Sequence, residues 1–188
     1  KCGGGEGGSA EESTADSIVR PTIDTVIADT PVAIWEVPKD CPEVIKKLAA
    51  NMVYVEGGTF TMGATPEQGS DVEDNEKPTH KVTLSDFYIG KYEVTQAEWK
   101  AVMGTNPSKF KGDNLPVENV TWFDCQEFIR RLDSITGLPF RLPTESEWEF
   151  AARGGNRSLG YRFAGSNIID SVSWYLNNAG FRQHQIAS

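Results

Sequence analysis

Residues 141–155, Arg-Leu-Pro-Thr-Glu-Ser-Glu-Trp-Glu-Phe-Ala-Ala-Arg-Gly-Gly, contain both a start signal and a stop signal for a helix. Pro143 lacks a backbone N–H and favours an extended residue before it. Thr144 is a good helix N-cap, and Glu147 follows three residues later, so the two form a capping box. The two glycines at the end of the run favour termination. The run therefore predicts a short helix over 144–152.

Side-chain spacing on this helix predicts which face it buries. Trp148, Ala151 and Ala152 lie on one face by the i, i+3, i+4 rule, and we expect that face to be covered. The run holds no nucleophile and no metal-ligand cluster, so it points to architecture rather than to chemistry.

Two more helices are marked by the same kind of signal. Thr95 opens a capping box with Glu98, and Gly104 is placed to end that helix. Thr121 is placed to cap a longer helix that ends at Gly137. Its apolar residues at helical spacing are Cys125, Phe128, Ile129, Leu132 and Ile135. A further short helix is expected over 44–48, after Cys41.

Strand patterns occupy residues 52–94. Residues 52–55 and 59–62 flank Gly57-Gly58, and we expect them to pair as a hairpin. Strand character returns over 78–84 and 87–94. The predicted fold class is α+β. The helices that begin at Thr121 and Thr144 should pack on small, twisted antiparallel sheets, with many loops between them.

Charge and composition exclude some partners. The net charge is −9 and the pI is about 4.8, which argues against nucleic acid because a phosphate backbone attracts basic surfaces. No apolar stretch is long enough to span a membrane. The acidic loop over 64–78 lacks the ligand spacing of an EF-hand. No cofactor is therefore assigned, and calcium stays an open alternative.

The sequence divides into three expected parts. Residues 1–30 are rich in Gly, Ser, Thr and acidic side chains, and we interpret them as a flexible linker or a lipoprotein tether. Residues 31–50 form a transitional segment, and 51–188 form the folded domain. An acylated Cys2 would anchor the chain to a membrane through lipid alone. The expected location is then extracytoplasmic, at a bacterial cell surface or in the periplasm, although an unstructured terminus explains the same residues.

The three cysteines match no redox or zinc motif. Cys125 lies on the apolar face of its predicted helix, where a cysteine packs as a small hydrophobe. Cys41 is the only cysteine of the folded region that we expect to be exposed.

Five ordered motifs carry a family resemblance beyond the 141–155 run. They are M-x-x-V-x-G-G-x-F-x-M-G over 52–63, P-x-H-x-V-x-L over 78–84, Asn-Pro-Ser over 106–108, P-V-x-x-V-T-W over 116–122, and W-Y-x-x-N-x-G over 174–180. Together they resemble the formylglycine-generating enzyme (sulfatase-modifying factor) family, which has a C-type-lectin-like fold. The resemblance covers about residues 51–180.

The resemblance implies a chemistry that this sequence does not itself carry. Members of the family that are enzymes bind copper(I) through a pair of cysteines and oxidise a substrate cysteine to formylglycine. That pair belongs to a later part of the family domain, so no position here receives the catalytic role. We expect the domain to be incomplete at its C-terminus, with the remainder of its own longer chain as a partner. By itself, this polypeptide should have no formylglycine-generating activity.

Several functions stay open. The first is a non-catalytic module for ligand binding or surface display, which recognises a protein or a small molecule. The second is a formylglycine-generating oxidase whose catalytic part lies beyond this sequence. The third is a variable protein of a diversity-generating retroelement, which the resemblance also covers. A structural envelope component on the same fold is a fourth.

If the chain is a binding module, the irregular region 156–183 should carry the ligand, because the helices are constrained by folding. The candidate binding residues are Tyr175, Asn177, Asn178 and Arg182, whereas Trp174 is expected to fill the core. Alanine at Tyr175, Asn178 or Arg182 should weaken binding without changing the melting temperature.

Overall fold

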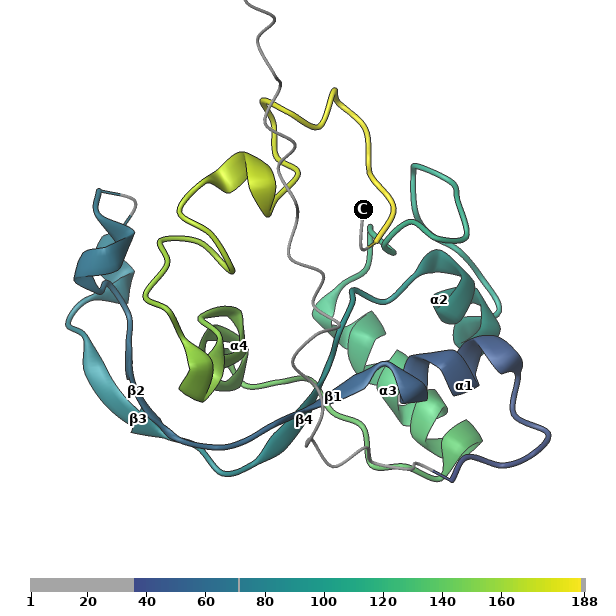
Figure 1. Ribbon diagram of the computed structural model, residues 1–188. Coiled ribbons are helices and arrows are strands. Elements are labelled where there is room, and N and C mark those ends of the chain that lie inside the picture. Colours follow the sequence, from purple (N-terminus) through teal and green to yellow (C-terminus); the bar gives the residue numbers. More distant parts are fainter. Residues whose placement is uncertain (1–35, 71, 187–188) are drawn as a thin grey trace, which may run out of the picture. The chain divides into compact units, whose positions relative to one another are not determined.

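A computed structural model describes residues 36–70 and 72–186 (Figure 1). Cys2 and Trp35 lie outside the described residues, as does the linker expected over 1–30. In the described part, helix α1 (Glu43–Ala50) leads into strands β1 (Met52–Val55) and β2 (Thr59–Met62). Strands β3 (His80–Thr83) and β4 (Phe87–Gly90) follow. The later elements are helices α2 (Gln96–Met103), α3 (Trp122–Thr136) and α4 (Glu145–Ala152), with short 3₁₀ turns at Pro66–Gln68, Asp74–Glu76, Gly155–Arg157 and Ile169–Ser171.

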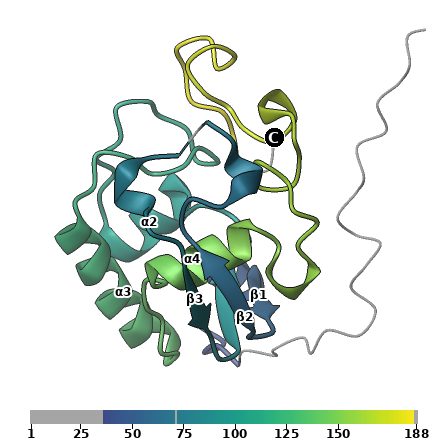
Figure 2. The ribbon, with the colours of Figure 1, turned by 90° about the vertical axis from the view of Figure 1, so that its left-hand side faces the viewer.

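The four strands of residues 36–70 and 72–186 form two antiparallel pairs, β1 with β4 and β2 with β3. Figures 1 and 2 show β1–β2 running alongside β3–β4 as a bent two-stranded ribbon. Strand formation over 78–84 and 87–94 is confirmed by β3 and β4. The expected hairpin between β1 and β2 is wrong, because these two strands follow one another along the same side of the ribbon.

The glycine pair causes a bend instead of a hairpin turn. A Cβ atom on Gly57 would lie 2.3 Å from the carbonyl oxygen of Leu84, so only glycine allows the two backbones to pass this closely. The Gly57 N–H donates to the Asp86 carboxylate over 2.8 Å, and the Leu84 N–H donates to the Gly58 carbonyl over 2.9 Å. The ribbon therefore keeps its cross-strand bonds through the bend.

The main core lies among the first three helices. The Trp99 and Phe128 rings stack in parallel at 5.0 Å and join α2 to α3, while Ile45 of α1 and Leu132 of α3 are buried beside them. Helix α3 thus packs on α2, not on a sheet as its sequence led us to expect. Cys41 belongs to the same core and is only 6% exposed, so the expectation that it is accessible is wrong. The α1 segment, which lies in the stretch interpreted as transitional, contributes to this core.

Helix α4 covers the other pair of strands. Phe150 is 2% exposed and its ring lies 5.2 Å from the ring of Phe60 in β2. The expected burial of the Trp148 face is wrong, since Trp148 is 61% exposed. Glu147 and Phe150, three residues apart, are the buried residues of α4. Glu147 faces inward because its carboxylate accepts hydrogen bonds from the Arg141 guanidinium and from the backbone N–H of the N-cap residue Thr144. The α+β fold class is confirmed, with α4 packed on one of the small sheets.

The helix boundaries follow the capping signals. The hydroxyls of Thr95, Thr121 and Thr144 each accept a hydrogen bond over 3.2 Å from the N–H three residues later. Gly104 and Gly137 end their helices in the left-handed conformation, which costs glycine little. Three of the four α-helices in the described part of the chain thus begin where local capping residues in the sequence indicate.

The ion pair beneath α4 predicts a pH dependence. Arg141 donates to both carboxylate oxygens of Glu147, over 2.7 and 2.5 Å, and this interaction lowers the pKa of Glu147 to about 2, with help from the Thr144 cap. The unfolded pKa of a glutamate is about 4.3. Because the folded pKa is the lower one, the stabilisation is present above about pH 4.3 and is lost as the pH falls toward 2.

We therefore expect Glu147→Gln to lower the free energy of unfolding by about 1–3 kcal/mol at pH 7, and by less at pH 2.5. Urea denaturation of both proteins across this pH range measures the difference. Glu145→Gln, on the same helix but exposed, is the matched control and should change stability little. A deficit for Glu147→Gln that stays constant with pH would contradict this account.

Candidate functional site

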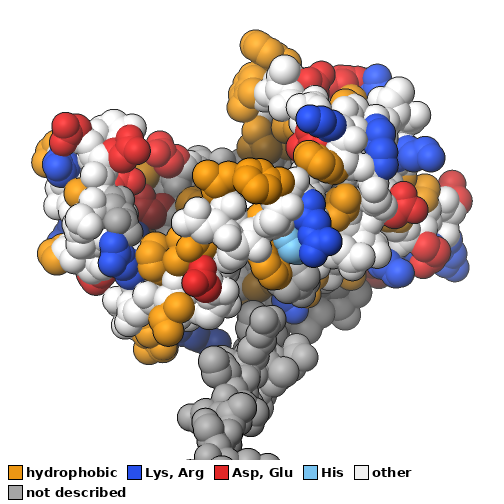
Figure 3. All heavy atoms as spheres, turned by 90° about the horizontal axis from the view of Figure 1, so that it is seen from above, with side chains coloured by type: hydrophobic (Ala, Val, Ile, Leu, Met, Phe, Trp, Pro, Cys, Tyr) orange, Lys and Arg blue, Asp and Glu red, His pale blue; other side chains and the backbone are white. Residues whose placement is uncertain are grey.

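Exposed apolar side chains concentrate in the irregular segment after α4. Of the twelve large hydrophobic residues that are exposed in the described part, seven lie between 159 and 181. They are Leu159, Tyr161, Ile168, Val172, Trp174, Leu176 and Phe181. Seen from above, several groups of hydrophobic side chains lie among charged and other side chains (Figure 3). Such a surface is typical of a contact region, because isolated domains rarely expose large apolar patches.

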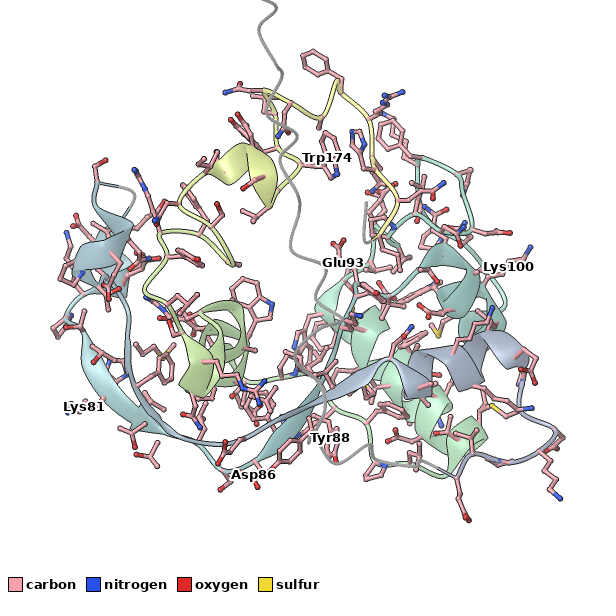
Figure 4. All side chains as sticks on the ribbon, in the orientation of Figure 1. Lys81, Asp86, Tyr88, Glu93, Lys100 and Trp174 are labelled. Atoms are coloured by element: carbon pink, nitrogen blue, oxygen red, sulfur yellow. The ribbon has the colours of Figure 1, made fainter. Side chains whose placement is uncertain are left out.

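Trp174 lies in this segment and projects from the C-terminal loop (Figure 4). The expectation that it fills the core is wrong, since it is 49% exposed. Its ring stacks on His184 with centroids 3.8 Å apart and planes 5° apart, and the His184 ring nitrogen lies 3.0 Å from the Ala179 carbonyl oxygen. The loop therefore holds the indole in place without burying it. A histidine ten residues beyond the tryptophan gave no periodic signal that could have predicted this stack.

The structure brings three of the four predicted binding residues into one turn. The Asn178 side chain accepts from the Tyr175 N–H over 2.7 Å and donates to the Ser173 carbonyl over 2.9 Å. A hydrogen bond with Asp170 raises the pKa of the Tyr175 hydroxyl, and Asn177 interacts with the same hydroxyl. Asn177 and Arg182 are exposed, whereas Tyr175 and Asn178 are half-buried. Asn178 thus shapes the loop, and a role for these four residues in binding stays a prediction.

A second site, which the sequence did not predict, lies along the outer face of α4. A pocket there is lined by Glu145, Trp148 and Ala152 of the helix. Loop residues from two distant parts of the chain complete it. They are Gly63, Gln68, Glu76, Tyr161, Arg162, Phe163 and Ala164, together with the helix ion pair Glu149–Arg153. This site combines exposed aromatic rings with carboxylates.

The cysteines in the described part have the surroundings of packed thiols. Burial raises the pKa of both Cys41 and Cys125, and both are free. A reactive cysteine needs the opposite shift, toward the thiolate. Among the described residues, no cluster of His, Cys, Asp and Glu side chains is arranged to hold a metal ion, and no helix has the length and apolar character to cross a membrane.

Family comparison agrees with the fold and the motifs. The family model described as the Sulfatase-modifying factor enzyme 1-like domain matches residues 38–188. The chain belongs to this family. The resemblance to the sulfatase-modifying factor family is thereby confirmed, and the matched region includes α1.

Curated relatives in this family carry different names. A protein named Chaperone protein LppX from Paenibacillus barcinonensis is 39% identical over 163 residues, which cover 69% of this chain and 55% of the relative. A Formylglycine-generating enzyme from Thermomonospora curvata is 30% identical over 172 residues, covering 64% of this chain and 54% of the relative. This member of the sulfatase-modifying factor family thus spans about half the length of these curated relatives.

Solved structures support the same fold assignment. Treponema denticola variable protein 1 has a TM-score of 0.57 and 28% identity, covering 71% of this chain and 63% of that one. PvdO from Pseudomonas aeruginosa has a TM-score of 0.56 and 27% identity, covering 79% and 59%.

Proposed function

We propose that this chain is a non-catalytic recognition module on the sulfatase-modifying factor scaffold, and that it binds a protein ligand. The observation that carries the proposal is the exposed apolar surface at 159–181, where the Trp174 ring stacks on His184. An ordered, half-exposed aromatic ring is a good binding anchor, because it buries large area at little entropic cost. The similarity to a protein named as a chaperone and to a protein named as variable supports a role in recognition.

A second function is oxidation of a sulfatase cysteine by a longer protein. The 30% identity to a Formylglycine-generating enzyme favours this alternative. It would need a redox cysteine pair, and Cys41 and Cys125 are packed thiols with raised pKa values. Copper(I) would therefore bind elsewhere than at the described cysteines. A third alternative is a variable protein of a diversity-generating retroelement, for which the similarity to Treponema denticola variable protein 1 is the support.

The proposed setting is extracytoplasmic. We propose attachment through a lipid on Cys2 and contact with the remainder of a longer chain. Intact-mass measurement of the protein from membranes tests the first point, since an unmodified Cys2 would contradict it. Calcium stays an alternative aid to loop order and is assigned no ligands.

The test of recognition uses an array of diverse twelve-residue peptides as the probe. Trp174→Ala and Phe181→Ser should each reduce the binding of apolar peptides by about tenfold, because a lost anchor costs about 1–2 kcal/mol. Asn177→Ala and Arg182→Ala, at exposed predicted positions, should weaken binding without changing the melting temperature. Asn178→Ala should instead loosen the loop, since its side chain joins two backbone groups.

Phe110→Ser is the control, because Phe110 is an exposed aromatic residue outside the segment. Peptide binding that is unchanged by both Trp174→Ala and Phe181→Ser would overturn the proposal. If Phe110→Ser reduced peptide binding equally, the binding would be non-specific hydrophobic association and not recognition at a defined site.

A further inference from the structure

The pocket on the outer face of α4 is built from one stripe of the helix. Glu145, Trp148, Glu149 and Ala152 follow the i, i+3, i+4, i+7 spacing and line the same cavity. Because Ala152 is small, it leaves room beside the indole ring. The opposite wall comes from residues 161–164, with Tyr161 41% exposed and Phe163 half-buried.

The Arg153 guanidinium in this pocket is already occupied. It donates to Glu149 over 2.8 Å, to the Thr65 hydroxyl over 2.7 Å, and to the Gly63 carbonyl over 2.8 Å. It also donates to the Gln68 side chain over 3.2 Å. Glu149 in turn accepts from the Gly63 N–H over 3.0 Å. This ion pair is therefore part of the framework, and its charges cancel.

The other charged groups leave the pocket acidic. Glu76 accepts a hydrogen bond from the Glu73 N–H over 3.1 Å, and the Arg162 guanidinium lies 5.4 Å from the centre of the Phe163 ring. The carboxylate of Glu145 makes no hydrogen bond or ion pair with any other side chain in the described part of the chain. It lies in the first turn of α4, where the helix dipole favours negative charge. The pocket lining thus includes three carboxylates and two guanidiniums. Of the three carboxylates, that of Glu145 can bind a ligand without giving up another contact.

The Trp148 indole adds a flat, accessible surface to this carboxylate. It is 61% exposed, although it sits on an ordered helix whose neighbouring Phe150 is buried. A cation that lies over an indole face is attracted by the ring electrons, and an arginine guanidinium also stacks on it and bonds to a carboxylate. The apolar stem of such a side chain would pack along Tyr161 and Ala152.

We propose that the pocket between α4 and residues 161–164 binds an arginine side chain of a peptide ligand. The guanidinium stacks on Trp148 and donates to Glu145. This pocket shares Tyr161 with the apolar surface at 159–181, but its lining does not include Trp174 or Phe181, whose variants test the proposed function. Either proposal can therefore fail without the other.

The experiment titrates the protein with the blocked peptide acetyl-Gly-Gly-Arg-Gly-Gly-amide and follows the indole N–H signals by NMR. The sequence has five tryptophans, and Trp148→Phe assigns the relevant signal. We expect the Trp148 signal to shift saturably with a Kd of about 1 mM, as suits a single side-chain contact. The same peptide with citrulline, which lacks the charge, should bind at least about fivefold more weakly, since an exposed cation–π contact and ion pair contribute about 1 kcal/mol.

Two variants locate the binding. Glu145→Gln and Trp148→Ala should each weaken arginine binding about threefold or more and leave the melting temperature unchanged. Trp174→Ala should leave the binding of the arginine peptide unchanged. Each of three results would overturn the proposal. The arginine and citrulline peptides bind equally, the Glu145→Gln variant binds the arginine peptide as tightly as the unmodified protein, or the Trp148 signal shows no saturable shift.

Discussion

Replacing Phe150 with alanine is expected to lower the free energy of unfolding by about 3–5 kcal/mol. Phe150 is 2% exposed, and its ring lies 5.2 Å from that of Phe60, so truncation leaves a cavity between α4 and β2. Urea denaturation, followed by far-ultraviolet circular dichroism, gives the difference. The effect should be large because this contact joins α4 to the β2–β3 pair.

Trp148→Ala is the matched control for that experiment. The two positions lie two residues apart on one helix, but Trp148 is exposed and its loss should cost less than about 0.5 kcal/mol. The helix spacing alone predicted the opposite, namely that the Trp148 face is buried, so that Trp148→Ala would cost the larger share of stability. A larger loss of stability at Trp148 than at Phe150 would restore the original assignment of the buried face.

Arg153→Met is expected to cost about 2–4 kcal/mol, because methionine keeps part of the apolar stem and removes every hydrogen bond. Arg153 and Glu149 are both partly buried, with side chains 23% and 20% exposed. Without the guanidinium, the Glu149 carboxylate, the Gly63 carbonyl and Gln68 lose a partner in a poorly hydrated place. Thermal and urea denaturation measure the loss.

Arg157→Met serves as the comparison for charge, since Arg157 is exposed and lies four residues further along the chain. It should change stability by less than about 0.5 kcal/mol. If both variants lose equally, net charge and not the hydrogen-bond network explains the effect.

The helix ends were predictable because the residues that decide them lie within four positions. Thr144 and Glu147 cap α4 through bonds that span three residues. The pairing of β1 with β4 was not predictable in the same way, since a glycine pair between two strands fits a turn and also fits a close crossing. The crossing was decided by Leu84 and Asp86, which lie far from Gly57 in the sequence.

The candidate sites were likewise predictable where their residues are close in sequence, and not where they come from distant segments. The loop made by Tyr175, Asn177 and Asn178 is local, and the sequence placed these residues together. The exposure of Trp148 was mispredicted because periodicity identifies a helix face without its neighbours. What fixes the orientation of α4 is the inward ion pair from Arg141 and the contact with Phe60. The α4 pocket needs residues 63–76 and 161–164 together, so no short motif reports it.

The network around Arg153 has a consequence for the order in which the chain is synthesised. Gly63 contacts Glu149 and Arg153 across 86 and 90 residues. At about 5–20 residues per second, a ribosome makes the strands roughly 5–20 s before it makes the helix that covers them. During that interval the β2–β3 pair has an uncovered Phe60 face and unpaired edges, and an isolated strand pair is at best marginally stable. The emerging chain is therefore most exposed to misassociation before α4 arrives, and the helix acts as the late cover that ends this interval.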